Sequence, residues 1–168
     1  ERAPTGAELA YTTLPEHVTL NLQRTNRSPG WQPDRPGGIL LTTPGFARAA
    51  VRLDIAGEWQ LWLAGSVSRA LDVQVDGRTI GAIEDRRNYP EQWERVGTAE
   101  LDAGRHRVEL LRGGGDLEPG NGGINTAGPL VFTRGGDDAG EVERAPLEDA
   151  GSVCERSDLD WIEIVAPS

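Results

Sequence analysis

Hydrophobic and polar residues alternate along three segments in the middle of the chain. In the segments 58–64, 71–75 and 106–110, the residues that recur at every second position are mainly apolar. A period of two residues is typical of β-strands that bury one face. The pair Asp76-Gly77 follows the second segment, and both residue types tolerate the positive φ angles of a tight hairpin turn. The middle of the chain is therefore predicted to be antiparallel β-structure.

Shorter runs of the same kind predict further strands on both sides of this region. No segment longer than about ten residues follows the helical period, and 22 glycines and 11 prolines separate the strands. A length of 168 residues is that of one ordinary domain with a real core. We therefore expect an all-β protein, a single domain over residues 1–168, with roughly eight or more strands in two antiparallel sheets. The residues expected inside are Trp59, Leu61, Leu71, Val73, Val75, Val108 and Leu110.

Several short motifs follow one another in an order that resembles a known group of proteins. They are Ala56-Gly57-Glu58-Trp59, Leu71-Asp72-Val73-Gln74-Val75-Asp76-Gly77, Trp93, Leu101-Asp102-Ala103-Gly104-Arg105-His106 and Leu159-Asp160-Trp161-Ile162-Glu163-Ile164. From about Phe46 to Val165, the chain resembles the carbohydrate-binding modules of families 6 and 35 and the wider galactose-binding-like jelly rolls. The resemblance implies a jelly-roll β-sandwich of two antiparallel sheets. Extracytoplasmic domains of this kind also occur on membrane glycosyltransferases of actinobacteria.

Charge and composition narrow the range of partners. The chain carries 27 acidic and 17 basic residues, which gives a net charge of −10 and opposes binding to nucleic acid or to an anionic membrane surface. No stretch approaches the ~20 apolar residues of a membrane helix, so this segment is not expected to insert into a membrane. Because the sequence starts at Glu1 and contains no methionine, we expect a portion of a larger chain. This expectation of a larger chain, together with the resemblance, favours an extracytoplasmic domain. It would be secreted or at the cell surface, and tethered to that larger chain.

Tryptophan residues are the first candidates for ligand binding, because a flat apolar ring bordered by hydrogen-bonding groups suits the C–H face and hydroxyl rim of a sugar. Trp62 faces the opposite way from Trp59 on the same predicted strand. Gln60 shares its face, and Asp72 and Gln74 would share it if the next strand were its neighbour. These residues predict an aromatic platform with a polar border. The alternative is that a loop or the second sheet covers Trp62.

A second group of candidates lies in one predicted loop. Arg87, Asn88 and Tyr89 precede Trp93, and the position of Trp93 matches a tryptophan common in the resembled families. Loops at one end of a sandwich often carry ligand-binding residues, so these four side chains are predicted to form a binding rim. The alternative is that Trp93 caps the core beneath its loop. Trp31 is a further loop aromatic with the same two interpretations.

Carboxylates are the third candidates, and here the resemblance supplies the hypothesis. The resembled modules commonly hold a structural calcium ion where the first strand meets the last, and Glu8 and Asp160 match those positions. Calcium takes six to eight oxygen ligands, so carboxylates from both chain ends would suit it. The alternative is that both residues are solvated surface carboxylates.

We therefore expect a domain that binds a polysaccharide or glycan without altering it. The alternative from another class is a structural or protein-interaction β-sandwich that braces a larger cell-surface protein or membrane glycosyltransferase. An enzyme is the third and weakest hypothesis. The sequence contains no Ser-His-Asp signature, phosphate loop, histidine cluster or nucleotide fingerprint to support it.

Overall fold

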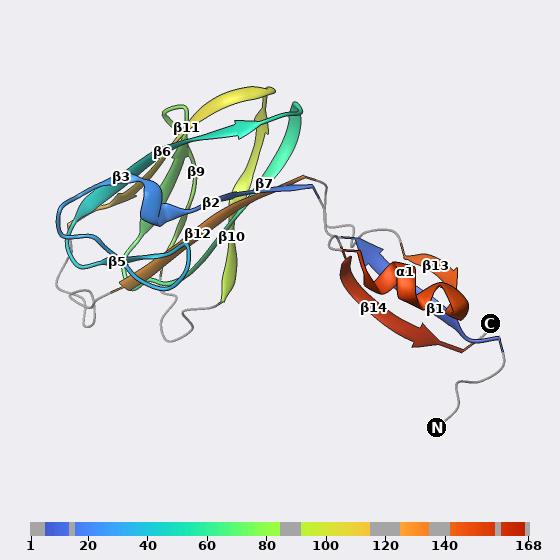
Figure 1. The fold of residues 1–168 in the computed structure, drawn as a ribbon. Coiled ribbons are helices and arrows are strands. Elements are labelled where there is room, and N and C mark those ends of the chain that lie inside the picture. The colour runs from blue at the N-terminus through green and yellow to red at the C-terminus, as the bar shows by residue number, and fades with distance from the viewer. Residues whose placement is uncertain are drawn as a thin grey trace. The chain divides into compact units, whose positions relative to one another are not determined.

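The computed structural model describes residues 6–13, 16–84, 92–114, 125–134, 142–156 and 159–166. The chain forms two compact units (Figure 1). The larger unit spans His17–Arg134, and the smaller unit is built from both chain ends, Glu1–Glu16 and Gly135–Ser168. The β-sandwich expected over residues 1–168 lies within the larger unit. That the two units make up one domain stays a prediction.

The first sheet of the larger unit, called here the β7 sheet, is antiparallel with the strand order β10-β7-β12-β5-β4. A further strand, β2, also pairs with β12. The bounds are β2 His17–Leu20, β4 Gln32–Pro33, β5 Ile39–Leu41, β7 Gly57–Ser66, β10 Trp93–Leu101 and β12 Asn125–Arg134.

The second sheet, called here the β11 sheet, is also antiparallel, with the strand order β3-β6-β11-β8-β9. Its strands are β3 Asn26–Arg27, β6 Gly45–Leu53, β8 Leu71–Val75, β9 Arg78–Ile83 and β11 Gly104–Arg112. A short 3-10 helix, η1 (Leu22–Arg24), connects β2 to β3. Figure 1 shows the strands of the two sheets as two layers of the larger unit.

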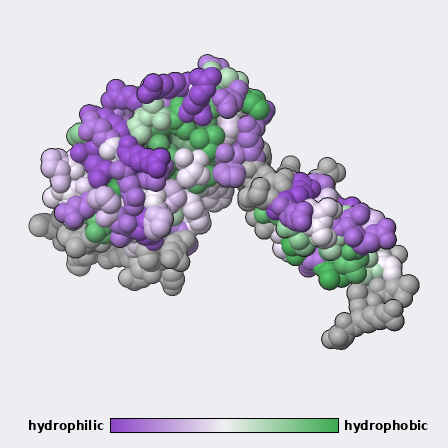
Figure 2. All heavy atoms as spheres, in the orientation of Figure 1, coloured by the Kyte–Doolittle hydropathy of each residue, from purple (hydrophilic) through white to green (hydrophobic). Residues whose placement is uncertain are grey.

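The apolar residues of both sheets meet in one core between the two layers. Trp59, Leu61 and Leu63 point inward from β7, and Phe132 adds a second large ring from β12. All seven residues expected inside are buried, which confirms the period-two reading of these strands. Figure 2 shows hydrophilic residues over much of the visible face of the larger unit, as expected when the apolar side chains face inward. The all-β jelly-roll sandwich is therefore confirmed.

Consecutive strands of the middle region alternate between the two sheets more often than they form hairpins. The predicted turn at Asp76 and Gly77 is a true hairpin between β8 and β9, and both residues have positive φ, 51° and 79°. The chain between β7 and β8 instead crosses from one sheet to the other, and so does the chain between β10 and β11. Strands adjacent in sequence are therefore not always neighbours in a sheet.

Two glycines allow one edge of the sandwich to close. Gly81 on β9 and Gly97 on β10 belong to different sheets, yet their backbones approach each other closely. A Cβ atom on Gly81 would overlap the carbonyl oxygen of Val96, and one on Gly97 would lie 2.6 Å from the carbonyl oxygen of Ile80. Only glycine leaves room for this approach.

The smaller unit is a three-stranded antiparallel sheet with β1 (Glu8–Thr13) between β13 (Glu143–Pro146) and β14 (Leu159–Val165). The 3-10 helix η2 (Leu147–Asp149) and helix α1 (Ala150–Cys154) connect β13 to β14. Leu9, Tyr11 and Val153 form its small core. The first and last strands of the chain thus pair, as the resemblance implies, and they do so in the smaller unit.

Candidate functional site

Trp62 lies in the middle of the outer face of the β7 sheet. Its cross-strand partners are Arg95 on β10 and Val131 on β12, so strands flank it on both sides. The side chain is half-buried, and its Nε1 donates a hydrogen bond of 3.1 Å to Oγ1 of Thr133 on β12. This bond holds the indole over β12 and satisfies its only polar group within the sheet. The second sheet cannot cover Trp62, because it packs on the other face.

Trp93 lies on the same outer face, next to Trp62. It opens β10 opposite Ala64, and it is 45% exposed. Ala64 follows Trp62 by two positions on β7, so the two tryptophans are diagonal neighbours on one face. Diagonal neighbours of a sheet lie about 7–8 Å apart, which is within reach of aromatic side chains. The structure therefore brings Trp62 and Trp93 together.

Polar residues form the next row of this face. Gln60 has Thr98 and Thr133 as its cross-strand partners, and His17 on β2 lies opposite Thr133. Thr98 and His17 are exposed, Thr133 is half-buried, and Gln60 is buried at 6% exposure. Two hydroxyls, a carboxamide and an imidazole thus form the row next to Trp62. This surface, made of Trp62, Trp93, Gln60, Thr98, Thr133 and His17, is called here the tryptophan face.

The other ligand candidates lie elsewhere. Asp72 and Gln74 are on β8 in the β11 sheet, where Gln74 Nε2 donates to Thr79 Oγ1 at 3.3 Å. The expectation that they border Trp62 is wrong, because the chain changes sheets between β7 and β8. Trp31 is buried, with its Nε1 donating to the carbonyl oxygen of Thr43 at 2.9 Å. The predicted rim residues Arg87, Asn88 and Tyr89 lie outside the described residues.

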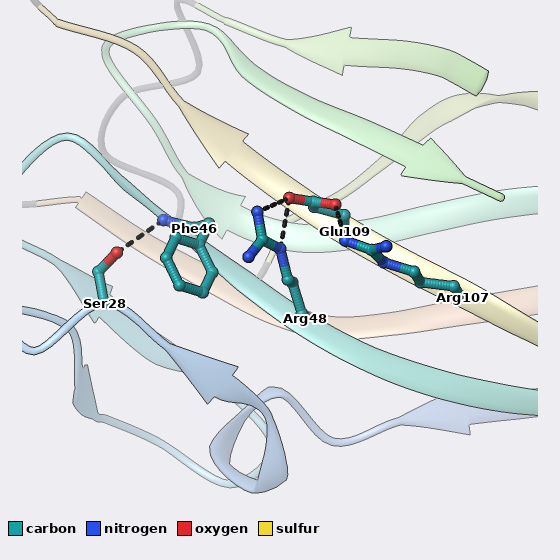
Figure 3. A network of polar contacts seen from close by, with 5 residues as sticks. All are labelled: Ser28, Phe46, Arg48, Arg107 and Glu109. Carbon is teal, nitrogen blue, oxygen red and sulfur yellow. Dashed lines mark hydrogen bonds and ion pairs between the residues drawn. The ribbon is translucent and has the colours of Figure 1, made fainter. Parts of the chain in front are cut away.

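The outer face of the β11 sheet carries a second polar cluster (Figure 3). Glu109 accepts hydrogen bonds from Arg48 Nε at 2.6 Å and from Arg107 at 3.0 Å. The bond from Arg48 lowers the pKa of Glu109 below its ordinary value. The Arg48 guanidinium also lies 4.1 Å from the centre of the Phe46 ring. Because these groups satisfy one another, this face suits a sugar less well than the tryptophan face does.

The predicted calcium ligands lie at opposite ends of the pairing between β1 and β14. Glu8 pairs with Val165 on β14, whereas Asp160 lies five positions before Val165 at the other end of that strand. Five residues of a strand span about 17 Å, which is far beyond the reach of one ion. The Glu8 carboxylate also forms an ion pair of 3.2 Å with Arg144 on β13. Within the described ranges, no group of three or more His, Cys, Asp or Glu side chains is placed to hold a metal. These two residues therefore do not fit a shared calcium ion.

The inner face of β11 holds two polar residues whose burial was not predicted. The inward positions are His106, Val108, Leu110 and Arg112, so a polar side chain lies at each end. Arg112 is 3% exposed and donates to the Leu41 carbonyl oxygen at 2.6 Å and to Asn125 Oδ1 at 3.0 Å. Burial, together with the nearby charge of Arg69, lowers its pKa below the ordinary value. The period-two spacing of positions 106 to 112 was the signal that could have identified both residues.

Comparisons with known proteins support the fold. No protein-family model matches the sequence, and no curated protein matches it. Among solved structures, the chain is similar to the Podospora anserina GH26-CBM35 β-(1,4)-mannanase, with a TM-score of 0.53 and 10% identity over 73% of this chain and 28% of that chain. It is also similar to the CBM36-1 domain of a multidomain xylanase from the hindgut metagenome of Trinervitermes trinervoides, with a TM-score of 0.51 and 11% identity over 73% of this chain and 100% of that one. At this level of identity, the likeness establishes the jelly-roll β-sandwich fold.

Proposed function

We propose that this chain is a non-catalytic carbohydrate-binding module and that the tryptophan face is its binding surface. The observation that carries the proposal is the placement of Trp62 and Trp93 as neighbours on one outer face, with a row of polar side chains next to Trp62. Aromatic rings stack on the apolar face of a sugar, while hydroxyl, amide and imidazole groups bind its rim. The names of the two similar structures, a mannanase with a family-35 module and a xylanase module of family 36, support the same ligand class.

The exposed ring area sets the expected strength of binding. Stacking one sugar on one indole buries about 100 Å², which contributes roughly 2 to 3 kcal/mol before ordering costs. Two rings therefore support a Kd in the millimolar to high-micromolar range. Repeated contacts along a polymer raise the apparent affinity without new contacts.

An extracytoplasmic location, in a chain tethered to a larger protein, is part of the proposal. Cell-wall and plant polysaccharides of the kind proposed as ligands lie outside the cell, and the net charge of −10 favours neutral partners over polyanions. In the part of the chain that the structure describes, we find no helix with the length and apolar character needed to cross a membrane. Structural calcium remains part of the hypothesis only with ligands other than the Glu8 and Asp160 pair.

A protein-interaction role is the second candidate, and one observation favours it. On β14 of the smaller unit, Trp161 is 40% exposed and Ile164 is 58% exposed. Hydrophobic atoms also gather along one side of this unit in the view of Figure 2. Trp161 and Ile164 are three positions apart and lie on opposite faces of β14, so each face offers one exposed apolar side chain to a protein partner.

The two candidates are separated by a binding experiment with matched variants. Wild-type protein and Trp93→Ala are tested on a glycan array and on insoluble mannan, xylan and cellulose. Trp161→Ala is the control, since Trp161 is exposed to a similar extent but lies in the other unit. We expect the wild type and Trp161→Ala to bind at least one polysaccharide without releasing reducing sugar, and Trp93→Ala to lose binding at least tenfold. If the wild type binds no glycan, the proposal fails and the protein-interaction role is favoured.

A further inference from the structure

The smaller unit has two edge strands of unequal character. β13 and β14 flank β1, and among the described strands each of them pairs with β1 alone. β13 is four residues long and contains Arg144 and Pro146. A short edge strand with charged side chains and a proline, which lacks a backbone N–H, is poorly suited to further pairing. This edge of the sheet is therefore protected.

β14 lacks these protective features. It is seven residues long and contains no proline, glycine, lysine or arginine. The irregularity in its pairing with β1 lies before Trp161, and the register from Trp161 to Val165 is regular. The outer edge of such a strand presents a row of backbone N–H and C=O groups that another strand can bind.

The exposed apolar side chains of β14 lie on both of its faces. Ile164 lies opposite Leu9, on the face of the small core, whereas Trp161 lies opposite Thr12 on the other face, and both are exposed. A partner that docks on one face would cover only one of them. A strand that pairs with the outer edge of β14 extends both faces and places side chains beside both residues. This distribution favours strand pairing.

The sequence of β14 suits a second copy of itself in the antiparallel direction. When Ile162 of the two copies lie opposite each other, Glu163 of each copy lies opposite Trp161 of the other. A shift to centre the pair on Glu163, or a parallel pair in register, places the two Glu163 side chains directly opposite each other, which is destabilising. Charge therefore favours the antiparallel pair centred on Ile162.

The two edges together set the size of the assembly. Pairing through β14 uses the same edge of both copies, so the contact is closed by a two-fold axis, and the protected β13 edges do not extend it. Two strands of seven residues are only about 23 Å long, which is a small contact for a dimer. The net charge of −10 on each copy also opposes association. The Kd expected is therefore roughly tens to hundreds of micromolar.

We propose that the outer edge of β14 is a self-association site, at which two copies of this chain pair antiparallel into a weak dimer. The three-stranded sheets of the two smaller units then form one continuous sheet. This inference does not rest on the proposed carbohydrate-binding function.

The test is sedimentation velocity from about 10 μM to about 1 mM protein, a range that brackets the expected Kd. We expect a dimer that accumulates with concentration and becomes stronger with added salt, because salt screens the repulsion between two acidic chains. Ile164→Lys should weaken association by about tenfold or more, since a lysine on an edge strand opposes pairing. Glu163→Gln removes one negative charge from each copy and should strengthen association severalfold.

Val142→Lys is the matched control. Val142 is exposed to a similar extent as Ile164, but it precedes β13, so the same change in charge should leave the dimer unaffected. Hydrogen exchange in dilute and concentrated samples locates the contact, with added protection expected in residues 159–165 and none in residues 143–146. Protein that stays monomeric at the highest concentration, a dimer that Ile164→Lys leaves unchanged, or growth beyond two copies would overturn the inference. These outcomes leave the proposed glycan binding untouched.

Discussion

The His106 imidazole and the Asp76 carboxylate form a hydrogen-bonded pair, with 2.7 Å between Nδ1 and Oδ2. The other ring nitrogen, Nε2, lies 2.8 Å from the carbonyl oxygen of Asp102, which can only accept a hydrogen bond. Asp76 Oδ1 also accepts from the backbone N–H of Arg107 at 2.7 Å. Buried His106 therefore ties the hairpin turn between β8 and β9 to the connection between β10 and β11, and this arrangement favours the doubly protonated ring.

This pair predicts a stability that depends on pH. Burial alone lowers the pKa of His106, but the bonds to Asp76 and to the Asp102 carbonyl outweigh it, so its pKa lies above the ordinary value. The bond to His106 lowers the pKa of Asp76. The contribution of protonated His106 to the free energy of unfolding is therefore fully present below about pH 6.5, and it is lost as the pH rises through the raised pKa. The aspartate contribution is lost in acid, as the pH falls below about 4 and through the lowered pKa.

We expect Tm to be highest between about pH 4 and pH 6.5 and to fall towards pH 8. Asp76→Asn keeps a side chain that tolerates the φ of 51° but removes the charge. It should cost about 1 to 2 kcal/mol near pH 5.5, because the Asp76 side chain is half-exposed, and it should flatten the decline above pH 6.5. Thermal denaturation at several pH values measures both effects. His17→Gln is the control, and an unchanged slope in Asp76→Asn would assign the pH dependence to other groups.

Gly81→Ala is predicted to destabilise the sandwich strongly. Its new Cβ would overlap the Val96 carbonyl oxygen, and backbone cannot move aside as a flexible side chain can. We expect a loss of about 3 kcal/mol or more in the free energy of unfolding, measured by urea denaturation. Gly97→Ala meets Ile80 at 2.6 Å and should cost less, which gives a measurement even if Gly81→Ala does not fold. Gly113→Ala has open space around it and should stay within about 0.5 kcal/mol of the wild type. Equal stability of all three variants would contradict the close approach of β9 and β10.

Calcium is predicted to leave the melting curve unchanged if Glu8 and Asp160 are its only candidate ligands. A ligand that binds only the native state raises Tm by mass action, but these two residues lie at opposite ends of the pairing between β1 and β14. Melting curves in EDTA and in excess calcium chloride test this expectation. A Tm that rises with calcium and keeps rising in Glu8→Gln would show that a different set of oxygen ligands holds the ion.

Local pattern predicted the strands well because the buried face of a strand depends on its own period of two residues. Trp59 and Val73 were placed inside correctly for this reason. Which strands become neighbours depends on packing between distant segments. Trp62 meets Thr133, 71 positions away, while Asp72, only ten positions away, lies in the other sheet. The polar border of Trp62 therefore could not be found from the neighbouring sequence.

The resemblance gave a correct expectation for the jelly-roll fold, but the first and last strands pair in the smaller unit and not in the sandwich. It did not predict the partner of Glu8, because the Arg144 side chain comes from β13, a strand that the sequence pattern did not identify. The Arg144 guanidinium balances the negative charge of the Glu8 carboxylate, which a bound cation would otherwise balance.

Trp59, Trp62 and Trp93 of the larger unit differ in burial, so they should also differ in what they contribute to stability. Trp59 is fully buried, and its Nε1 donates to the Ile55 carbonyl oxygen at 3.3 Å, so Trp59→Ala should cost about 3 to 5 kcal/mol. Trp62→Ala removes a half-buried ring and its bond to Thr133, for which we expect about 1 to 2 kcal/mol. Trp93→Ala removes an exposed ring and should change stability by about 0.5 kcal/mol or less.

Glycan binding should not follow the same order. Trp93→Ala and Trp62→Ala should weaken binding at temperatures where both variants are fully folded, because their rings lie on the tryptophan face. Urea denaturation and binding to insoluble mannan and xylan, measured on the same preparations, compare the two properties directly. If Trp62→Ala destabilises the protein as much as Trp59→Ala and the wild type binds no glycan, Trp62 acts as a core residue. The bracing role would then be favoured over carbohydrate binding.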